Sequence, residues 1–158
     1  MTKELKQQLT LKISQANKTQ LIIILYEMVL LYTEESRQAW HAGDRSAFRE
    51  AIRKTRGCMN ELMSSLHFEY EPAWNLLQLY LYINRELARA DVHHETESLD
   101  HIDLIIKKLH DAYQSISKQD ASEPLMANAQ AVYAGLTYGK RALTESLTNQ
   151  GIDRGFRA

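Results

Sequence analysis

Apolar residues are densest in Leu21–Tyr32, where Glu27 is the only charged residue. A helix on a small bundle needs an apolar stripe about 100° wide. Five residues form such a stripe: Leu21, Ile24, Leu25, Met28 and Leu31. Others occupy the remaining faces: Ile22, Ile23, Val29, Leu30 and Tyr32. Because a helix that is apolar nearly all round is a buried helix, this segment needs more cover than a short chain readily supplies.

Local signals set the ends of this first long helix. Asn17 is a favourable N-cap, and Gln20 completes a capping box with it. Gly43 supplies a C-terminal stop, so the helix is predicted from Asn17 to about His41.

The second helix is predicted to begin after Asp44, a good N-cap. Its apolar and small positions recur at helical spacing: Phe48, Ile52, Thr55, Met59, Leu62 and Leu66. Gly57 lies inside the helix and costs about 1 kcal/mol relative to Ala. We therefore expect another helix to approach closely there.

Two more helices complete the predicted architecture. One runs from Pro72 to about Ala90 and is again apolar on more than one face. The other begins at Thr96 or Ser98 and ends near Ser117. Short connections favour antiparallel neighbours, so the fold class is all-α, an antiparallel up-down bundle of four long helices.

Two segments alternate apolar and polar residues with a period of two, as strands do. They are Leu9–Ser14 and residues 132–139, and we expect them to form a short strand pair between the two chain ends. Residues 1–158 are predicted to be a single domain, with the bundle at 16–118 and a C-terminal extension at 119–158.

Composition narrows the functional classes. The content of 44% hydrophobic and 25% charged residues is ordinary for a soluble domain, and a net charge of −1 argues against nucleic-acid binding. Cys58, the single cysteine, excludes an internal disulfide and fits a buried thiol in a reducing compartment. No signal peptide is evident, and the apolar stretch is too short to span a membrane. We expect a cytoplasmic protein.

Catalytic and metal-binding patterns are missing from the sequence. One ligand-like group consists of His93, His94, Glu95 and His101. Adjacent histidines point apart on a regular backbone, so we interpret this group as a solvated turn. We expect neither an enzyme nor a cofactor or metal.

Aromatic and methionine side chains on the two most apolar helices favour an interaction surface. Tyrosine offers an apolar body with a polar tip, and methionine adapts to irregular partners. Recognition of a partner helix in a groove is the main interpretation, and a homodimer without a client is the alternative.

Several short motifs resemble the flagellin export chaperone family, FliS. Ala16-Asn17 followed by Leu25-Tyr26-Glu27 is similar to the opening of that family's first long helix. Leu79-Tyr80-x-Tyr82 and Leu66-x-Phe68-Glu69 also fit, and the resemblance covers about residues 10–118. There are departures: Lys18 replaces a proline, Asp91 an asparagine and Tyr113 a tryptophan.

The resemblance implies a chaperone that binds the disordered C-terminal segment of flagellin in apolar grooves. It would prevent premature polymerisation and deliver flagellin to the flagellar type III export apparatus, whose gate has a cytoplasmic domain that is a further candidate partner. The predicted groove residues are Tyr26, Val29, Leu30, Met59, Met63, Leu77, Tyr80 and Leu81. The predicted groove cover is Leu9, Leu11 and Ile13. The role of 119–158 stays open between covering the groove, contacting the gate and bracing the N-terminus.

Overall fold

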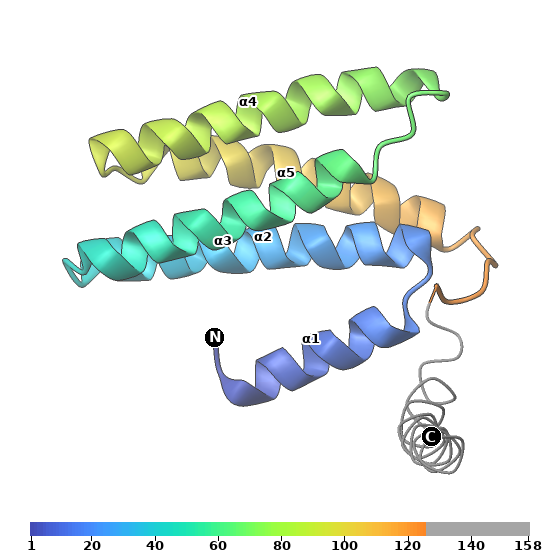
Figure 1. Cartoon of the computed structure of the whole chain (residues 1–158), viewed down its shortest axis with the longest axis horizontal. Helices are drawn as coiled ribbons and strands as arrows, with labels where there is room; N and C mark the ends of the chain where they lie inside the picture. Colours follow the sequence, from blue (N-terminus) through green and yellow to red (C-terminus); the bar gives the residue numbers. More distant parts are fainter. Residues whose placement is uncertain (126–158) are drawn as a thin grey trace, which may run out of the picture.

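The computed structural model describes residues 1–125, which contain five helices and no strand (Figure 1). The helices are α1 (Lys3–Gln15), α2 (Lys18–His41), α3 (Arg45–Ser64), α4 (Glu71–His93) and α5 (Glu97–Ser117). The predicted all-helical fold is confirmed, with one helix more than expected. None of these five helices combines the length and the apolar character needed to cross a bilayer.

Four of the helices, α2 to α5, pack into one body. α2 contacts both α3 and α5, and α4 contacts the same two helices from the other side. α1 lies outside this body along α2 (Figure 1). α2 is therefore covered on three sides, which explains why its sequence is apolar nearly all round.

The predicted strand at Leu9–Ser14 is wrong, because these residues belong to α1. Thr2 caps this helix by accepting a hydrogen bond from the Leu5 N–H at 3.3 Å. Leu5, Leu9 and Ile13 recur every four residues and face α2. Leu9 and Ile13 are four residues apart, a spacing that fits both a strand and a helix. Leu5 was not included in the predicted strand, and its equal spacing from Leu9 favours a helix. Residues 132–139, the expected partner strand, lie outside the described residues.

The predicted caps of α2 and α3 are confirmed. The Asn17 side chain accepts from the Gln20 N–H at 2.9 Å, and the Gln20 side chain accepts from the Asn17 N–H at 3.0 Å. Asp44 accepts from the Ala47 N–H at 2.9 Å. Gly43 has φ +69°, a backbone conformation that glycine adopts without steric cost.

The predicted cap of α5 needs correction. Thr96 occupies the N-cap position, but its side chain makes no capping hydrogen bond. Glu95 takes this role instead, because its carboxylate accepts from the Ser98 N–H at 3.0 Å. α4 extends to His93 rather than Ala90, and the C-cap residue His94 that follows it has φ 52°.

The core lies between α2, α3, α4 and α5. α3 contributes the stripe predicted from its sequence, with Phe48, Ile52, Met59 and Leu62 all buried. The facing helices contribute these buried residues: Tyr26, Val29, Ile83, Leu87, Leu99, Ile102 and Ile106. Gly57 is exposed, and a Cβ built on it would meet no atom within 4 Å. The expected close approach of another helix at Gly57 is therefore wrong.

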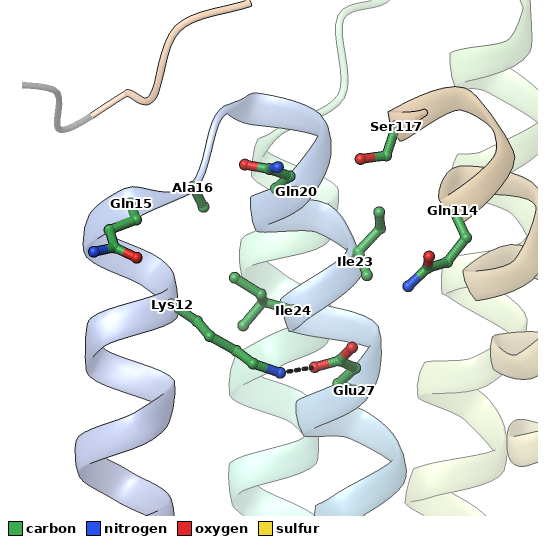
Figure 2. Close-up of a pocket in the computed structure, with 9 residues that line it drawn as sticks. All are labelled: Lys12, Gln15, Ala16, Gln20, Ile23, Ile24, Glu27, Gln114 and Ser117. Carbon is green, nitrogen blue, oxygen red and sulfur yellow. Dashed lines mark hydrogen bonds and ion pairs between the residues drawn. The ribbon is translucent and has the colours of Figure 1, made fainter. Parts of the chain in front are cut away.

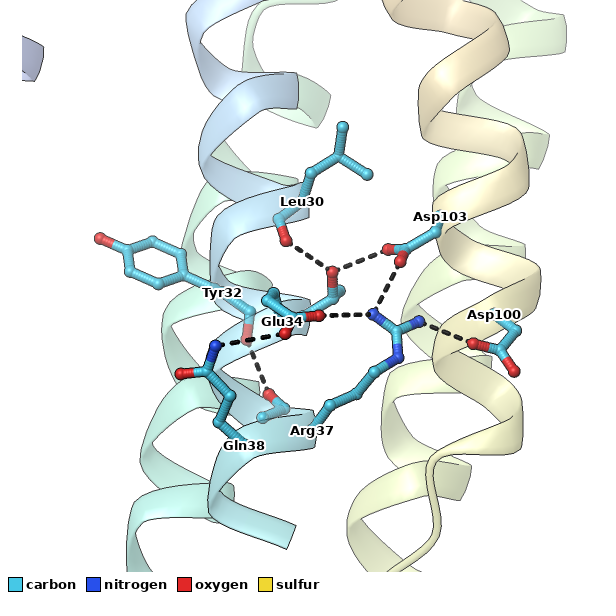
Figure 3. A network of polar contacts seen from close by, with 9 residues as sticks. Leu30, Tyr32, Glu34, Arg37, Gln38, Asp100 and Asp103 are labelled. Carbon is cyan, nitrogen blue, oxygen red and sulfur yellow. Dashed lines mark hydrogen bonds and ion pairs between the residues drawn. The ribbon is translucent and has the colours of Figure 1, made fainter. Parts of the chain in front are cut away.

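A polar network ties α2 to α5 beside the core (Figure 3). The Arg37 guanidinium lies 2.8 Å from Asp100 Oδ1 and 2.8 Å from Asp103 Oδ2. Thr33 donates its hydroxyl hydrogen to Asp103 Oδ1 at 2.7 Å. Burial opposes the charge of Arg37, but the two aspartates offset it and raise the pKa of the guanidinium. This network fixes α5 against the C-terminal half of α2.

Candidate partner-binding surfaces

Among the described residues 1–125, α1 is the helix that covers one face of α2. Leu9 and Ala16 of the N-terminal segment are buried together with Ile24 of α2. Half-buried apolar side chains surround these three: Met1, Leu5, Ile13, Leu21, Met28 and Leu31. We call the α2 part of this cluster, formed by Leu21, Ile24, Met28 and Leu31, the α2 face.

Two ion pairs hold α1 near its two ends. The N-terminal ammonium of Met1 lies 2.5 Å from Glu35 Oε1, and Lys12 Nζ lies 3.3 Å from Glu27 Oε2. The Lys12 and Glu27 side chains are both substantially exposed, so their pair contributes little free energy. Apolar contact with the α2 face and the largely buried Met1–Glu35 pair are therefore the main attachments of α1.

Hollows flank α1 on both sides. The larger one, about 440 Å³, lies between α1, α2 and the end of α5, and the Lys12–Glu27 pair borders it (Figure 2). The other, about 270 Å³, is bordered by Met1, Leu9, Met28 and Tyr32, among other residues. A third hollow, of about 200 Å³, lies between Leu21, Ile22 and Leu25 of α2 and the end of α3. α1 thus leaves space beside the face that it covers.

Four of the predicted groove residues lie in the core. Tyr26, Val29, Met59 and Tyr80 are each at most 1% exposed. The hydroxyl oxygens of Tyr26 and Tyr80 are hydrogen-bonded at 2.5 Å. Burial raises the pKa of both phenols, that of Tyr80 to about 12. Tyr26, Val29 and Met59 therefore lie inside the four-helix body, whereas Tyr80 borders a hollow of about 250 Å³ together with Leu76 and Tyr113.

The other four predicted groove residues reach the surface in part. Leu30, Met63 and Leu77 are half-buried, and Leu81 is 49% exposed. The Asn84 amide donates to Met63 Sδ at 3.7 Å, so this side of α4 borders α3. Leu77, Leu81 and Asn84 share that side by helical spacing. Helical spacing therefore puts Leu77 and Leu81 on the side of α4 from which Asn84 reaches Met63 of α3.

The predicted cover residues divide between two sides of α1. Leu9 is buried and Ile13 is half-buried against α2. Leu11 is 58% exposed and points away from α2. Leu5, which the sequence interpretation omitted, joins Leu9 and Ile13, and its four-residue spacing from Leu9 was the signal that could have found it.

Sequence reasoning also missed an exposed aromatic cluster at the start of α4. The rings of Phe68 and Trp74 lie 4.7 Å apart between centroids. Phe68, Tyr70 and Trp74 are 45%, 67% and 57% exposed. Trp74 lies off the buried α4 stripe of Ala73, Tyr80 and Ile83, and this offset was the available signal.

The candidate ligand-like residues have structural roles. The His94 ring packs edge-on against Phe48 at 4.8 Å, Glu95 caps α5, and His101 Nδ1 lies 3.0 Å from Glu86 Oε2. Within residues 1–125, no three His, Cys, Asp or Glu side chains are grouped closely enough to hold a metal. Cys58 is buried, and burial raises the pKa of its thiol to about 11. Its thiol is therefore protonated at neutral pH.

A helical body with an apolar face under one peripheral helix is an arrangement found in proteins that bind a partner helix in a groove. The sequence profile of the family FliS, described as flagellar protein FliS, matches residues 1–120. The chain belongs to this family, whose members are flagellar export chaperones. Comparison with curated protein sequences gives no match.

Proposed function

We propose that this protein binds the disordered C-terminal segment of flagellin, keeps flagellin from polymerising, and delivers it to the flagellar export apparatus. The observation that carries the proposal is the α2 face under α1, in a chain of the FliS family. The flagellin segment would fold into a short helix on this face and take the place of α1.

The composition of α1 supports its displacement. Leu9 is the one buried residue within the helix, and it lies between Leu5 and Ile13, which are only half-buried. A partner helix with a fuller apolar stripe would occupy the flanking hollows and remove more apolar surface from water. Burying about 1,000 Å² of apolar area contributes roughly 25 kcal/mol before ordering costs. The entropy cost of ordering a disordered partner is large. The partner therefore displaces α1 only because it buries more apolar area on the α2 face than α1 does.

A second contact is proposed at the border of α3 and α4. Met63, Leu77 and Leu81 are the apolar residues proposed to contact the client there, since each is at least partly exposed. An extended client can cover surfaces on two sides of a small body, as disordered segments commonly do. Leu30, which is half-buried on α2, remains a proposed contact, whereas Tyr26, Val29, Met59 and Tyr80 support the surface from beneath.

Calorimetric titration with a flagellin C-terminal peptide tests the proposal. Met28→Asp places a charge on the α2 face and should weaken binding at least ten-fold, because the carboxylate must be desolvated. Leu9→Asp leaves that face intact and weakens its cover, so it should tighten binding several-fold. Leu81→Asp should weaken binding if the border of α3 and α4 is a second contact.

Leu11→Asp is the matched control for Leu9→Asp, since it places the same charge on the exposed side of the same helix. It should leave affinity unchanged. Circular dichroism should show that all four variants keep their helical content. Equal weakening by Leu9→Asp and Met28→Asp would mean that α1 itself is part of the binding surface, and the proposed displacement would then be wrong.

A further inference from the structure

The chain turns back after α5 and contacts the joint between α1 and α2. The segment that follows α5, drawn in orange, lies beside this joint (Figure 1). Three hydrogen bonds make the contact: Leu125 N–H to Ala16 O at 2.9 Å, Asn17 Nδ2 to Ser122 O at 3.3 Å, and Thr19 Oγ1 to Asp120 Oδ2 at 2.6 Å. We call residues 119–125 the clasp.

The joint itself is short and buried. α1 ends at Gln15 and α2 begins at Lys18, so only Ala16 and Asn17 connect them. Both residues are 3% exposed and have extended backbones. For α1 to swing away from the α2 face, the backbone dihedral angles of these two residues must change. Because the clasp hydrogen-bonds to both of them, that rotation breaks its contacts.

Hydrogen bonds hold the Asp120 carboxylate of the clasp in position as an acceptor. The Asp120 carboxylate accepts from the Ser122 N–H at 2.9 Å and from the Thr19 hydroxyl. These hydrogen bonds favour the ionised carboxylate and lower the pKa of Asp120. Asp120 is therefore a charged acceptor at neutral pH, and it joins α2 directly to the segment that binds the joint.

We propose that the clasp holds α1 closed over the α2 face. The family match ends at residue 120, so most of this device lies in the part of the chain that the match does not include. Its consequence for a client rests on the proposed function: release of the clasp would expose the α2 face. The α1–α2 joint is then the point through which the C-terminal part of the chain acts on the client surface.

Hydrogen exchange of the full chain, read by mass spectrometry, tests the clasp without any client. Asn17→Asp keeps an acceptor for the Gln20 N–H, so α2 stays capped, but it removes the donor to Ser122 O. Thr19→Val removes the hydroxyl that binds Asp120 without changing charge. Each variant should accelerate amide exchange in α1 roughly three- to ten-fold, the range expected for one lost hydrogen bond.

Glu123→Ala is the matched control, since Glu123 lies in the same segment and is exposed. This variant should exchange like the parent protein. Exchange in α3, α4 and α5 should stay unchanged in all variants. Unchanged exchange in α1, or equal acceleration in every helix, would overturn the proposal.

Calorimetry with the flagellin peptide separates the two proposals. If the parent protein and the clasp variants all fail to bind the peptide, the proposed client is wrong, while faster exchange in α1 still supports the clasp. If the peptide binds the parent but the clasp variants show neither faster exchange nor higher affinity, the clasp is wrong and the client stands.

Discussion

Two glycines in this chain differ in what their backbones require. Gly43 has φ +69° where α2 ends, a conformation that strains any residue with a Cβ. Gly57 lies inside α3 on the exposed side, and no atom within 4 Å would meet a Cβ. Gly57 therefore lowers stability through its poor helix propensity and the conformational freedom that it gives the unfolded chain.

Gly57→Ala should therefore stabilise the protein by about 0.5–1 kcal/mol, because Ala has the higher helix propensity and loses less entropy on folding. Gly43→Ala should destabilise it by a similar amount. Urea denaturation of both variants against the parent measures the difference. A loss of stability in Gly57→Ala would show that this position is more constrained than its open surroundings indicate.

The buried tyrosine pair makes stability depend on pH in alkaline solution. Burial raises the pKa of Tyr80 from 10.0 to about 12. Between these values the folded state holds a proton that the unfolded state releases, so stability is complete below pH 10 and falls as pH rises toward 12. The double variant Tyr26→Phe/Tyr80→Phe should show a smaller fall across this range. Urea denaturation at pH 9 to 12 makes the comparison, and identical slopes for parent and variant would contradict it.

At the scale of elements, the five helices differ in how firmly they are attached. α2 and α5 share a core and the Arg37 network, whereas α1 is joined to α2 by one small apolar cluster and two ion pairs. We therefore expect α1 to have the lowest local stability of the five helices. Elements that move or are displaced in regulation commonly have low local stability.

Arg37→Met should destabilise the body by about 1–2 kcal/mol, since it leaves Asp103, whose side chain is 14% exposed, without its cation. Arg53→Met is the control, because Arg53 pairs with Glu50 at an exposed i,i+3 position of α3. The control should change stability far less. Thermal denaturation of the two variants makes the comparison, and equal shifts would mean that the Arg37 network carries no special weight.

In the molecule as a whole, apolar surface that the four-helix body does not bury is either covered by another helix or left exposed. On α2 it is covered by the chain's own α1, and on α4 it is left in part open at Leu81 and Trp74. The first arrangement suits a client that displaces a cover, and the second suits a surface that is always available.

Self-association is the competing use of this surface. Because α1 covers the α2 face within one chain, we expect the protein alone to sediment as a monomer at micromolar concentration and as a one-to-one complex with the flagellin peptide. Sedimentation velocity over a hundred-fold concentration range checks both. A dimer that persists on dilution and excludes the peptide would favour a structural role without a client.

Local sequence patterns were sufficient to predict the helical body, the positions of α2 to α5 and the caps of α2 and α3, because helix periodicity and capping are local properties. The sequence also identified the core stripe of α3, whose polar side is unmistakable. It could not assign the faces of α2 and α4, since a helix that is apolar nearly all round has no periodic signal to show which residues point inward. Packing decided that Tyr26 and Tyr80 lie in the core and Leu81 at the surface. Only the tertiary structure could join Thr19 to Asp120, because contacts between residues so far apart in the chain depend on how whole helices are placed.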